Sequence, residues 1–236
     1  MNLLKRITPQ IVLLGIICLV AAFSYVKTEV IGVSSVVDSV KTVIIDAGHG
    51  GFDGGAQAYD GTTEKDINLS ISQTVCSLLR FNGFNVIMTR DTDMGTEDDD
   101  TATIPKRKKS DLNNRLQLMK DNTDAIFVSI HLNKFTTSAA SGAQVFYTKN
   151  YSEARKLANC IQNSIKTLIQ PDNTRVIKQG SDSTYLLKNA AVPAIIVECG
   201  FLSNSRELEK LKDSDYQSQM AFAVANGIIE FYNQRS

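Results

Sequence analysis

Short apolar runs alternate with longer segments of helical spacing over most of this chain, from residue 42 to its end. The apolar runs predict strands at Thr42–Asp46, Asn85–Thr89, Ala125–Ile130, Ala143–Tyr147 and Ala194–Val197. The other segments predict helices at Glu64–Phe81, Ser110–Lys120, Ser152–Ile169 and Tyr216–Tyr232. Parallel strands need long crossover connections, which place helices on both faces of the sheet. The alternation therefore predicts a single α/β domain of three layers around a mostly parallel sheet.

The composition is compatible with one such domain and argues against one class of partner. A chain of 236 residues can bury a substantial core, and 43% hydrophobic and 21% charged residues are typical of globular proteins. Basic and acidic residues balance, so the formal net charge is zero. Because there is neither a general basic field nor a nucleic-acid-binding motif, we expect no nucleic-acid partner.

The first 28 residues differ from the rest of the chain. Lys5 and Arg6 precede an almost uninterrupted apolar stretch, Ile11–Val26, as in a signal peptide or an uncleaved signal anchor. We interpret residues 29–40 as a linker and residues 41–236 as the main domain. The sequence thus predicts an exported protein, either secreted or membrane-anchored, that contacts the membrane only through this leader.

The segment Asp91–Lys109 lacks a clear period and is strongly charged. It contains an acidic run, Glu97–Asp100, and a basic run, Lys106–Lys109. A cation site is one interpretation, but charged runs more often form solvated loops. We therefore expect a surface loop over the whole segment. Loops of this length in a compact domain often border a substrate groove.

The chain has only two histidines, and each comes after a predicted strand. These are His49 and His131, while Glu198 follows the last predicted strand and Glu64 begins the first predicted helix. In α/β sheets, ligands bind at the carboxyl ends of the strands, which is also where the following helices begin. We therefore expect these four side chains to converge at one edge of the sheet.

Two imidazoles and a carboxylate form the His₂Glu set that is typical of hydrolytic zinc sites. Zinc in such a site lowers the pKa of water to about 7 and polarises a carbonyl group. A second carboxylate, which is not a ligand, is then needed as general base and general acid. Glu198 suits this role, because it follows an apolar strand where partial burial would raise its pKa.

Each of these residues also has a structural interpretation. Glu64 lies within Thr63-x-x-Asp66, which resembles a capping box, and the helix dipole favours an acidic residue in the first turn. A single histidine is often a hydrogen-bonded structural residue, and Glu198 could form a buried ion pair. Their joint placement favours a site, while the choice between ligand and cap for Glu64 stays open.

Two rival kinds of site have less support. The glycine-rich run from Gly48 to Gly55 suggests a phosphate loop, but neither nucleotide-binding glycine motif is present. The next helix also begins about ten residues too late to offer its amide groups to a phosphate. A nucleophilic Cys199 or Ser129 is the second rival, and nothing in the sequence marks either residue as activated.

Four separated blocks match the motifs of a known family. They are IIDAGHGGFDGGA, EKDIN from Glu64, VSIHLN and PAIIVECGFLSN. In this order they resemble the zinc-dependent N-acetylmuramoyl-L-alanine amidases of the amidase-3 type, from about Thr42 to the C-terminus. The resemblance implies a six-stranded α/β sheet in a catalytic amidase domain over residues 41–236. It also implies hydrolysis of the amide between N-acetylmuramic acid and L-alanine in peptidoglycan.

The same blocks imply roles for individual residues. The ligands of one Zn²⁺ ion match His49, Glu64 and His131, and the catalytic glutamate matches Glu198. Asn133 and Arg115 fall at positions that line the site in this family, so the resemblance implies that they bind substrate.

We expect a leader and a catalytic domain without wall-binding repeats. In this the chain is similar to the spore-former amidases that strip peptide stems during cortex synthesis, a step toward muramic-δ-lactam. That similarity implies a location at the cell wall or between the forespore membranes. Without a wall-binding module, we expect an activating or targeting partner protein besides the peptidoglycan substrate. The alternative function is that of a non-catalytic relative, which binds the wall or regulates a partner, and the intact set of four side chains argues against it.

Overall fold

The computed structural model describes residues 41–99 and 101–235. The predicted leader and linker, residues 1–40, lie outside the described residues. Within the described part, no helix combines the length and the apolar character needed to cross a membrane.

A six-stranded sheet forms the centre of the domain, with the strand order β2-β1-β3-β6-β4-β5. Its strands are β1 (Thr42–Ala47), β2 (Asn85–Met88), β3 (Ile126–Asn133), β4 (Gln144–Tyr147), β5 (Lys178–Gln179) and β6 (Ala194–Phe201). All neighbouring strands pair in parallel except β4 and β6, which are antiparallel. The prediction of a mostly parallel, six-stranded sheet is confirmed.

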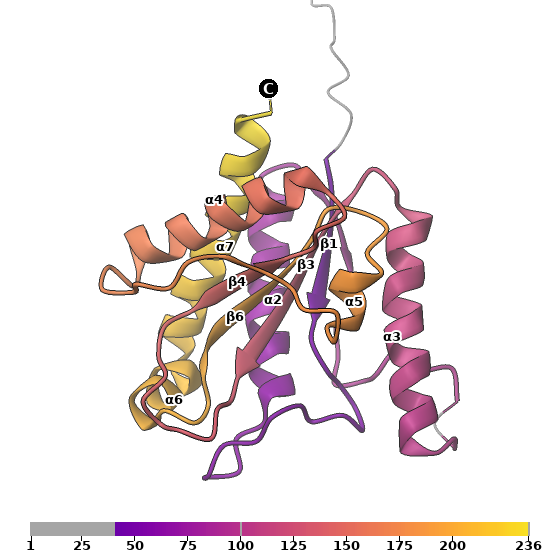
Figure 1. Ribbon diagram of the computed structural model, residues 1–236, viewed down its shortest axis with the longest axis horizontal. Helices are drawn as coiled ribbons and strands as arrows, with labels where there is room; N and C mark the ends of the chain where they lie inside the picture. The colour runs from indigo at the N-terminus through magenta and orange to yellow at the C-terminus, as the bar shows by residue number, and fades with distance from the viewer. Residues whose placement is uncertain (1–40, 100, 236) are drawn as a thin grey trace, which may run out of the picture. The chain divides into compact units, whose positions relative to one another are not determined.

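Helices cover both faces of the sheet. They are α2 (Glu64–Phe81), α3 (Ile104–Asp121), α4 (Ser152–Leu168), α5 (Tyr185–Lys188), α6 (Ser205–Lys212) and α7 (Ser214–Asn233). In Figure 1, α3 and α5 lie to the right of the strands, and α4 and α7 lie to their left. The three-layer α/β architecture predicted from the sequence is therefore confirmed.

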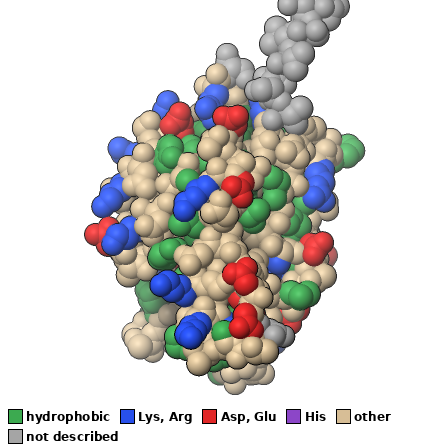
Figure 2. Space-filling view, turned by 90° about the vertical axis from the view of Figure 1, so that its right-hand side faces the viewer, with side chains coloured by type: hydrophobic (Ala, Val, Ile, Leu, Met, Phe, Trp, Pro, Cys, Tyr) green, Lys and Arg blue, Asp and Glu red, His purple; other side chains and the backbone are tan. Residues whose placement is uncertain are grey.

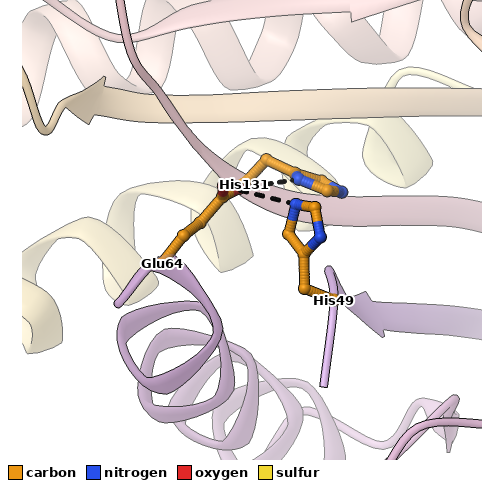
Figure 3. Close-up of side chains that lie close together, drawn as sticks. All are labelled: His49, Glu64 and His131. Carbon is orange, nitrogen blue, oxygen red and sulfur yellow. Dashed lines mark hydrogen bonds and ion pairs between the residues drawn. The ribbon is translucent and has the colours of Figure 1, made fainter. Parts of the chain in front are cut away.

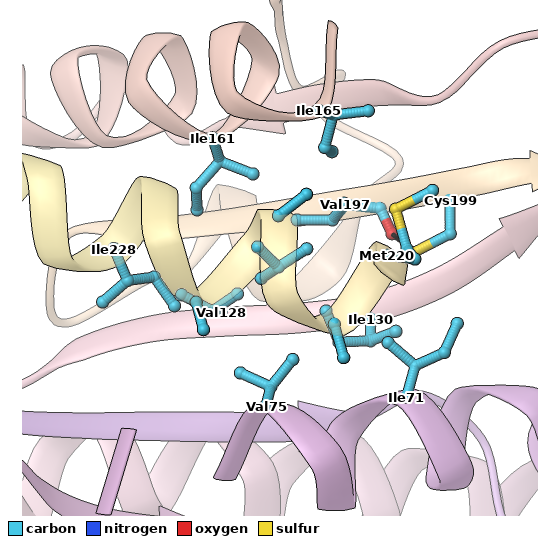
Figure 4. Close-up of a cluster of buried hydrophobic side chains, with 14 of the residues drawn as sticks. Ile71, Val75, Val128, Ile130, Ile161, Ile165, Val197, Cys199, Met220 and Ile228 are labelled. Atoms are coloured by element: carbon cyan, nitrogen blue, oxygen red, sulfur yellow. Dashed lines mark hydrogen bonds between the residues drawn. The ribbon is translucent and has the colours of Figure 1, made fainter. Parts of the chain in front are cut away.

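The two faces of the sheet carry separate hydrophobic cores. The larger core lies between the sheet and α2, α4 and α7, and Figure 4 shows side chains of these helices meeting Val128 and Val197. The smaller core includes Ile196 of β6 and packs against α3 and α5. Because successive side chains of a strand point to opposite faces, Glu198 is on the same face as Ile196. This alternation directs Glu198 toward the α3 side of the sheet.

The predicted loop over Asp91–Lys109 is wrong in its second part. Helix α3 begins at Ile104, so the basic run Lys106–Lys109 is helical. Pro105 lies at the start of this helix, where its fixed φ is favourable and its missing N–H group costs nothing. The charge pattern obscured this start, because four consecutive basic residues show no amphipathic period.

Strands β3 and β6 both extend beyond the apolar runs that predicted them. They pair in parallel as far as His131 opposite Glu198, and again at Asn133 opposite Phe201 after an irregularity. His131 and Glu198 therefore lie within strands rather than after them. Pairing between the two strands, which no single-strand pattern reveals, accounts for the difference.

Candidate active site

His49, Glu64 and His131 meet at the carboxyl edge of the sheet. Their potential ligand atoms all lie within 4.8 Å of one another. Figure 3 shows the two imidazole rings turned toward the carboxylate, with His49 Nε2 at 3.3 Å from Glu64 Oε2 and His131 Nδ1 at 2.9 Å from Glu64 Oε1. The three predicted ligands, which come from a loop, a helix and a strand, are thus assembled into one cluster.

Glycines allow these side chains to approach the backbone so closely. A Cβ atom on Gly48 would lie 2.3 Å from Nε2 of His131. A Cβ atom on Gly55, where φ is +70°, would lie 2.6 Å from both Oε2 of Glu64 and Cδ2 of His49. The absence of side chains at Gly48 and Gly55 therefore provides the space that the cluster occupies.

The backbone of His49 itself has an uncommon conformation. Its φ of 63° is in the left-handed region, which costs a residue with a side chain about 1–3 kcal/mol. Two buried arginines hold this turn: Arg115 Nη2 donates to the carbonyl of His49 at 2.8 Å, and Arg90 Nη2 donates to the carbonyl of Gly48 at 3.1 Å. These contacts stabilise the conformation that directs the imidazole toward Glu64.

Glu64 is buried and is held by several donors. The backbone N–H groups of Ala56 and Leu132 donate to its two carboxylate oxygens at 2.8 and 3.0 Å. Burial alone would raise the pKa of Glu64, but hydrogen bonds from His131 and His49 outweigh it and hold the pKa well below its usual range. The carboxylate is therefore ionised, as a metal ligand must be.

The capping interpretation of this helix start has less support. Thr63 is the N-cap residue of α2, but its side chain accepts no hydrogen bond from the helix backbone. It donates instead to the side chain of Asp66. Glu64 faces the two histidines, so its side chain belongs to the cluster, and its role as a metal ligand stays a prediction.

Asp53 orients His49 from the side away from Glu64. Its Oδ2 lies 2.8 Å from His49 Nδ1, while Nε2 faces Glu64. Burial disfavours the charged imidazole, but the hydrogen bonds to Asp53 and Glu64 outweigh it and raise the pKa of His49 to about 9. Carboxylates in this position fix the orientation of metal-binding histidines. Asp53 was not predicted from the sequence, although it is an acidic residue within GGFDGG, four residues after His49.

Glu198 lies beside the cluster without joining it. It pairs in register with His131, and its Oε2 is buried without a hydrogen-bond partner among the described residues. Burial raises the pKa of Glu198 to about 7, against the lowering effect of the nearby His131. A carboxyl group that titrates near neutral pH can both accept and donate a proton, which is what an acid–base catalyst requires.

Comparison with known proteins places this arrangement in a family. The model of the Amidase_3 family, N-acetylmuramoyl-L-alanine amidase, matches residues 43–230. The chain belongs to this family. The matched residues include the sheet from Val43 of β1 onward. They also include His49, Glu64 and His131 of the cluster and the neighbouring Glu198.

Individual relatives agree with this assignment. The germination-specific N-acetylmuramoyl-L-alanine amidase of Bacillus subtilis is 34% identical over 197 residues, which cover 84% of this chain and 82% of the relative. The CwlD amidase of Clostridioides difficile, solved in complex with the GerS lipoprotein, is 39% identical with a TM-score of 0.79, over 82% of this chain and 99% of that one. The AmiC2 amidase of Nostoc punctiforme is 31% identical with a TM-score of 0.69, over 83% of this chain and 98% of that one. Sequence and fold together support peptidoglycan amidase activity.

Arg115, expected to bind substrate, is fully engaged within the amidase. Its side chain is 2% exposed. Its N–H groups donate to the carboxylates of Asp46 and Asp111 and to the carbonyls of Ala47 and His49. These contacts account for all five of its donors. Arg115 thus holds the backbone of His49, and its expected contact with substrate stays a prediction.

Asn133, the other expected substrate contact, is the last residue of β3 and lies two positions beyond His131. It is half-buried, so part of the residue is open to solvent at the edge of the sheet that carries the site. Its expected contact with substrate stays a prediction.

The rival nucleophiles of this amidase have no support in the structure. Cys199 is fully buried on the side of the larger core, and burial raises the pKa of its thiol far above its usual range. The hydroxyl of Ser129 is also buried and donates to Asp46 at 2.5 Å. Neither group is accessible or activated, as a nucleophile must be.

Proposed function

We propose that this amidase uses one zinc ion to hydrolyse the amide between N-acetylmuramic acid and L-alanine in peptidoglycan. The observation that carries the proposal is the convergence of His49, Glu64 and His131, whose ligand atoms lie within 4.8 Å of one another. Two imidazoles and one ionised carboxylate are the donor set of catalytic zinc sites, which keep a further position for water. When bound, zinc makes water a stronger acid and polarises the scissile carbonyl.

The residues around this donor set have separate tasks. Asp53 orients His49, and the backbone donors to Glu64 keep its carboxylate in place. Glu198 accepts the proton of the attacking water and then donates it to the amine of L-alanine as the amide bond breaks. Burial in the metal-free fold raises the pKa of Glu198 above its ordinary value, which makes its carboxylate a stronger base for the first step.

Metal analysis combined with an activity measurement tests this proposal. The purified chain is assayed for zinc, and release of stem peptides from peptidoglycan is measured with and without a chelator. We expect release to stop with the chelator and to return when zinc is added back. Equal release in both samples would defeat the zinc mechanism.

We further propose that the amidase acts in synthesis of the spore cortex, where removal of the peptide stem leads toward muramic-δ-lactam. The similarity to the germination-specific amidase and to CwlD supports this role. Muropeptide analysis of cortex from cells that lack this protein tests it. Loss of muramic-δ-lactam is the expected result, and an unchanged content would contradict the role.

Export and a partner protein belong to the same proposal. The apolar stretch Ile11–Val26 supports export, because peptidoglycan lies outside the cytoplasmic membrane. The structure of CwlD with the GerS lipoprotein supports a partner for this chain as well. We expect the isolated amidase to digest purified sacculi slowly. Full activity without any added protein would argue against a required partner.

A further inference from the structure

A small pocket lies next to the proposed metal ligands. Its volume is about 250 Å³, and His49 and His131 form one wall. Leu112 of α3 and Leu186 of α5 contribute apolar surface, and Lys108 of α3 also lines it. Figure 2 looks onto the side of the molecule where α3 lies, and no histidine colour is visible on this face. A larger hollow of about 810 Å³ contains none of the four site residues.

The charged groups around this pocket are already paired, and one of them has hydrogen-bond donors left over. Asp46 and Asp111 bind Arg115, and Asp53 binds His49. The ammonium group of Lys108 has three donors, and its ion pair in the described part of the chain is with Asp53, at 3.0 Å. Its side chain is 51% exposed. Lys108 is thus the cation of the pocket that has donors left for a ligand.

We infer that this pocket binds the start of the peptide stem, and that Lys108 binds a free carboxylate of that stem. The inference rests on the proposed function. In the scissile amide, the carboxyl group of muramic acid is consumed, so the glycan side is neutral there, whereas acidic stem residues make the peptide side anionic. A cation in this pocket therefore favours binding of the anionic peptide side of the substrate over its neutral glycan side.

Shape and position agree with the charge. The pocket is smaller than the roughly 300–1,000 Å³ of sites that enclose drug-sized ligands, so it is too small for a disaccharide but suits a short peptide segment. Leu112 and Leu186 match the methyl group of L-alanine. Glu198, which donates a proton to the departing amine of L-alanine, faces the same side of the sheet as this pocket, as its alternation with Ile196 requires.

Two substrates that differ by one charge test the inference. They are the γ-methylamides of N-acetylmuramoyl-L-alanyl-D-glutamate and of its D-isoglutamine counterpart. The γ-amide stands for the bond to the next stem residue, so only the first substrate has a free carboxylate, at the α-position. Release of the dipeptide is measured with the full chain loaded with zinc, for the unaltered protein and for Lys108→Met. We expect Lys108→Met to raise KM for the acid by about three- to ten-fold, as for one half-exposed charged contact, and to leave KM for the amide unchanged.

Control variants separate this role from a structural one. Lys109→Met removes the next lysine of α3, which is exposed and does not line the pocket, and it should change neither KM. Lys108→Arg should restore most of the preference for the acid, and added salt should weaken that preference. Zinc content and kcat should be unchanged in all three variants.

The possible results are distinct. Equal losses on both substrates would mean that Lys108 acts through Asp53 and His49, and would overturn the inference. Unchanged KM values for both substrates would overturn it as well. If the unaltered, zinc-loaded chain releases no dipeptide from either substrate, the proposed function itself fails and the inference falls with it.

Discussion

Two polar clusters lie close together at the carboxyl edge of the same sheet, and they differ in how well their members are satisfied. In the cluster around Asp46 and Arg115, every N–H group of the guanidinium has a described acceptor. In the cluster of His49, Glu64 and His131, the neighbouring Glu198 has a buried oxygen without a described partner. Burial alone does not distinguish the two clusters, but hydrogen-bond satisfaction does.

This difference indicates that the Asp46–Arg115 cluster stabilises the fold, whereas the cluster beside Glu198 takes part in the reaction. A buried charge with all of its partners is rigid, and breaking its network costs stability. A buried carboxylate without a hydrogen-bond partner destabilises the fold until a ligand or a proton binds to it. We therefore expect changes in the first cluster to affect folding, and changes in the second to affect metal binding and turnover. The following variants test this division, beginning with the largest expected effect.

His49→Ala should abolish both zinc binding and hydrolysis. The variant removes one of the three proposed ligands. The two that remain, Glu64 of α2 and His131 of β3, are too few to hold zinc. Its effect on unfolding of the metal-free chain should be smaller than that of Arg115→Met, since the side chain of His49 is 24% exposed whereas that of Arg115 is 2% exposed. Zinc content and stem-peptide release measure the first effect, and urea denaturation of the metal-free chain measures the second. A variant with full zinc content would remove His49 from the ligand set.

Glu198→Gln should keep zinc and lose turnover by about 10²–10⁴-fold, the usual contribution of a general acid–base. The amide side chain has almost the same shape but cannot exchange the proton. The measurement is kcat on muramoyl peptides together with zinc content. Loss of zinc from this variant would show that ligand and acid–base residue have been assigned wrongly.

Arg115→Met should destabilise the fold by about 3–5 kcal/mol, because Asp46 is then left as a buried, unpaired charge. Both side chains are almost inaccessible, at 2% and 1% exposure, so solvent screens little of this effect. Urea denaturation measures the loss. The double variant Arg115→Met with Asp46→Asn should lose less than the sum of the single changes, since the two residues share one network. Additive losses would contradict that coupling.

The two clusters also differ in how far the sequence could predict them. His49, Glu64, His131 and Glu198 were predicted because each lies at the end of an apolar run or at a helix start, where ligands of α/β sheets bind. Asp53 was missed, because an acidic residue in a glycine-rich loop has the same appearance whether it orients a histidine or faces solvent. The pairing of Asp46 with Arg115 joins residues that are 69 positions apart, and no local pattern encodes it.

The fold shows the same limit. The long periodic helices and the apolar strands were predicted, because each buries one face and its sequence shows the corresponding period. Strand β5, with two residues, and helix α5, with four, are too short to show any period. Helix α6 was missed although Asn204 caps it by accepting from the backbone N–H groups of Arg206 and Glu207. Such short elements depend on contacts with the rest of the fold rather than on their own pattern.

Asp53→Asn should weaken zinc binding by about 10- to 100-fold, the usual effect of removing a carboxylate that orients a metal-binding histidine. Asparagine can still accept a hydrogen bond from His49 Nδ1, but it supplies no charge. Competition with a chelator measures the affinity, and the metal-free chain should lose a modest part of its stability, because Asp53 also pairs with His49 and Lys108. Asp60→Asn, at an exposed ion pair with Lys212, is a matched control that should leave zinc affinity unchanged. Equal affinities for Asp53→Asn and the unaltered chain would mean that the imidazole needs no such orientation.

The smallest expected effect is on stability: in the absence of metal, Glu198→Gln should raise the free energy of unfolding. The folded-state pKa of Glu198 is about 7, above the ordinary value of 4.5. The unfolded chain therefore releases this proton at lower pH than the folded one, and stability falls as pH rises from about 4.5 to about 7. Glutamine does not ionise, so the variant should be more stable by about 1–3 kcal/mol at pH 8 and nearly equal at pH 4. Urea denaturation of both chains at the two pH values measures this difference. A loss of stability at pH 8 would mean that Glu198 belongs with Arg115, among the residues that hold the fold together.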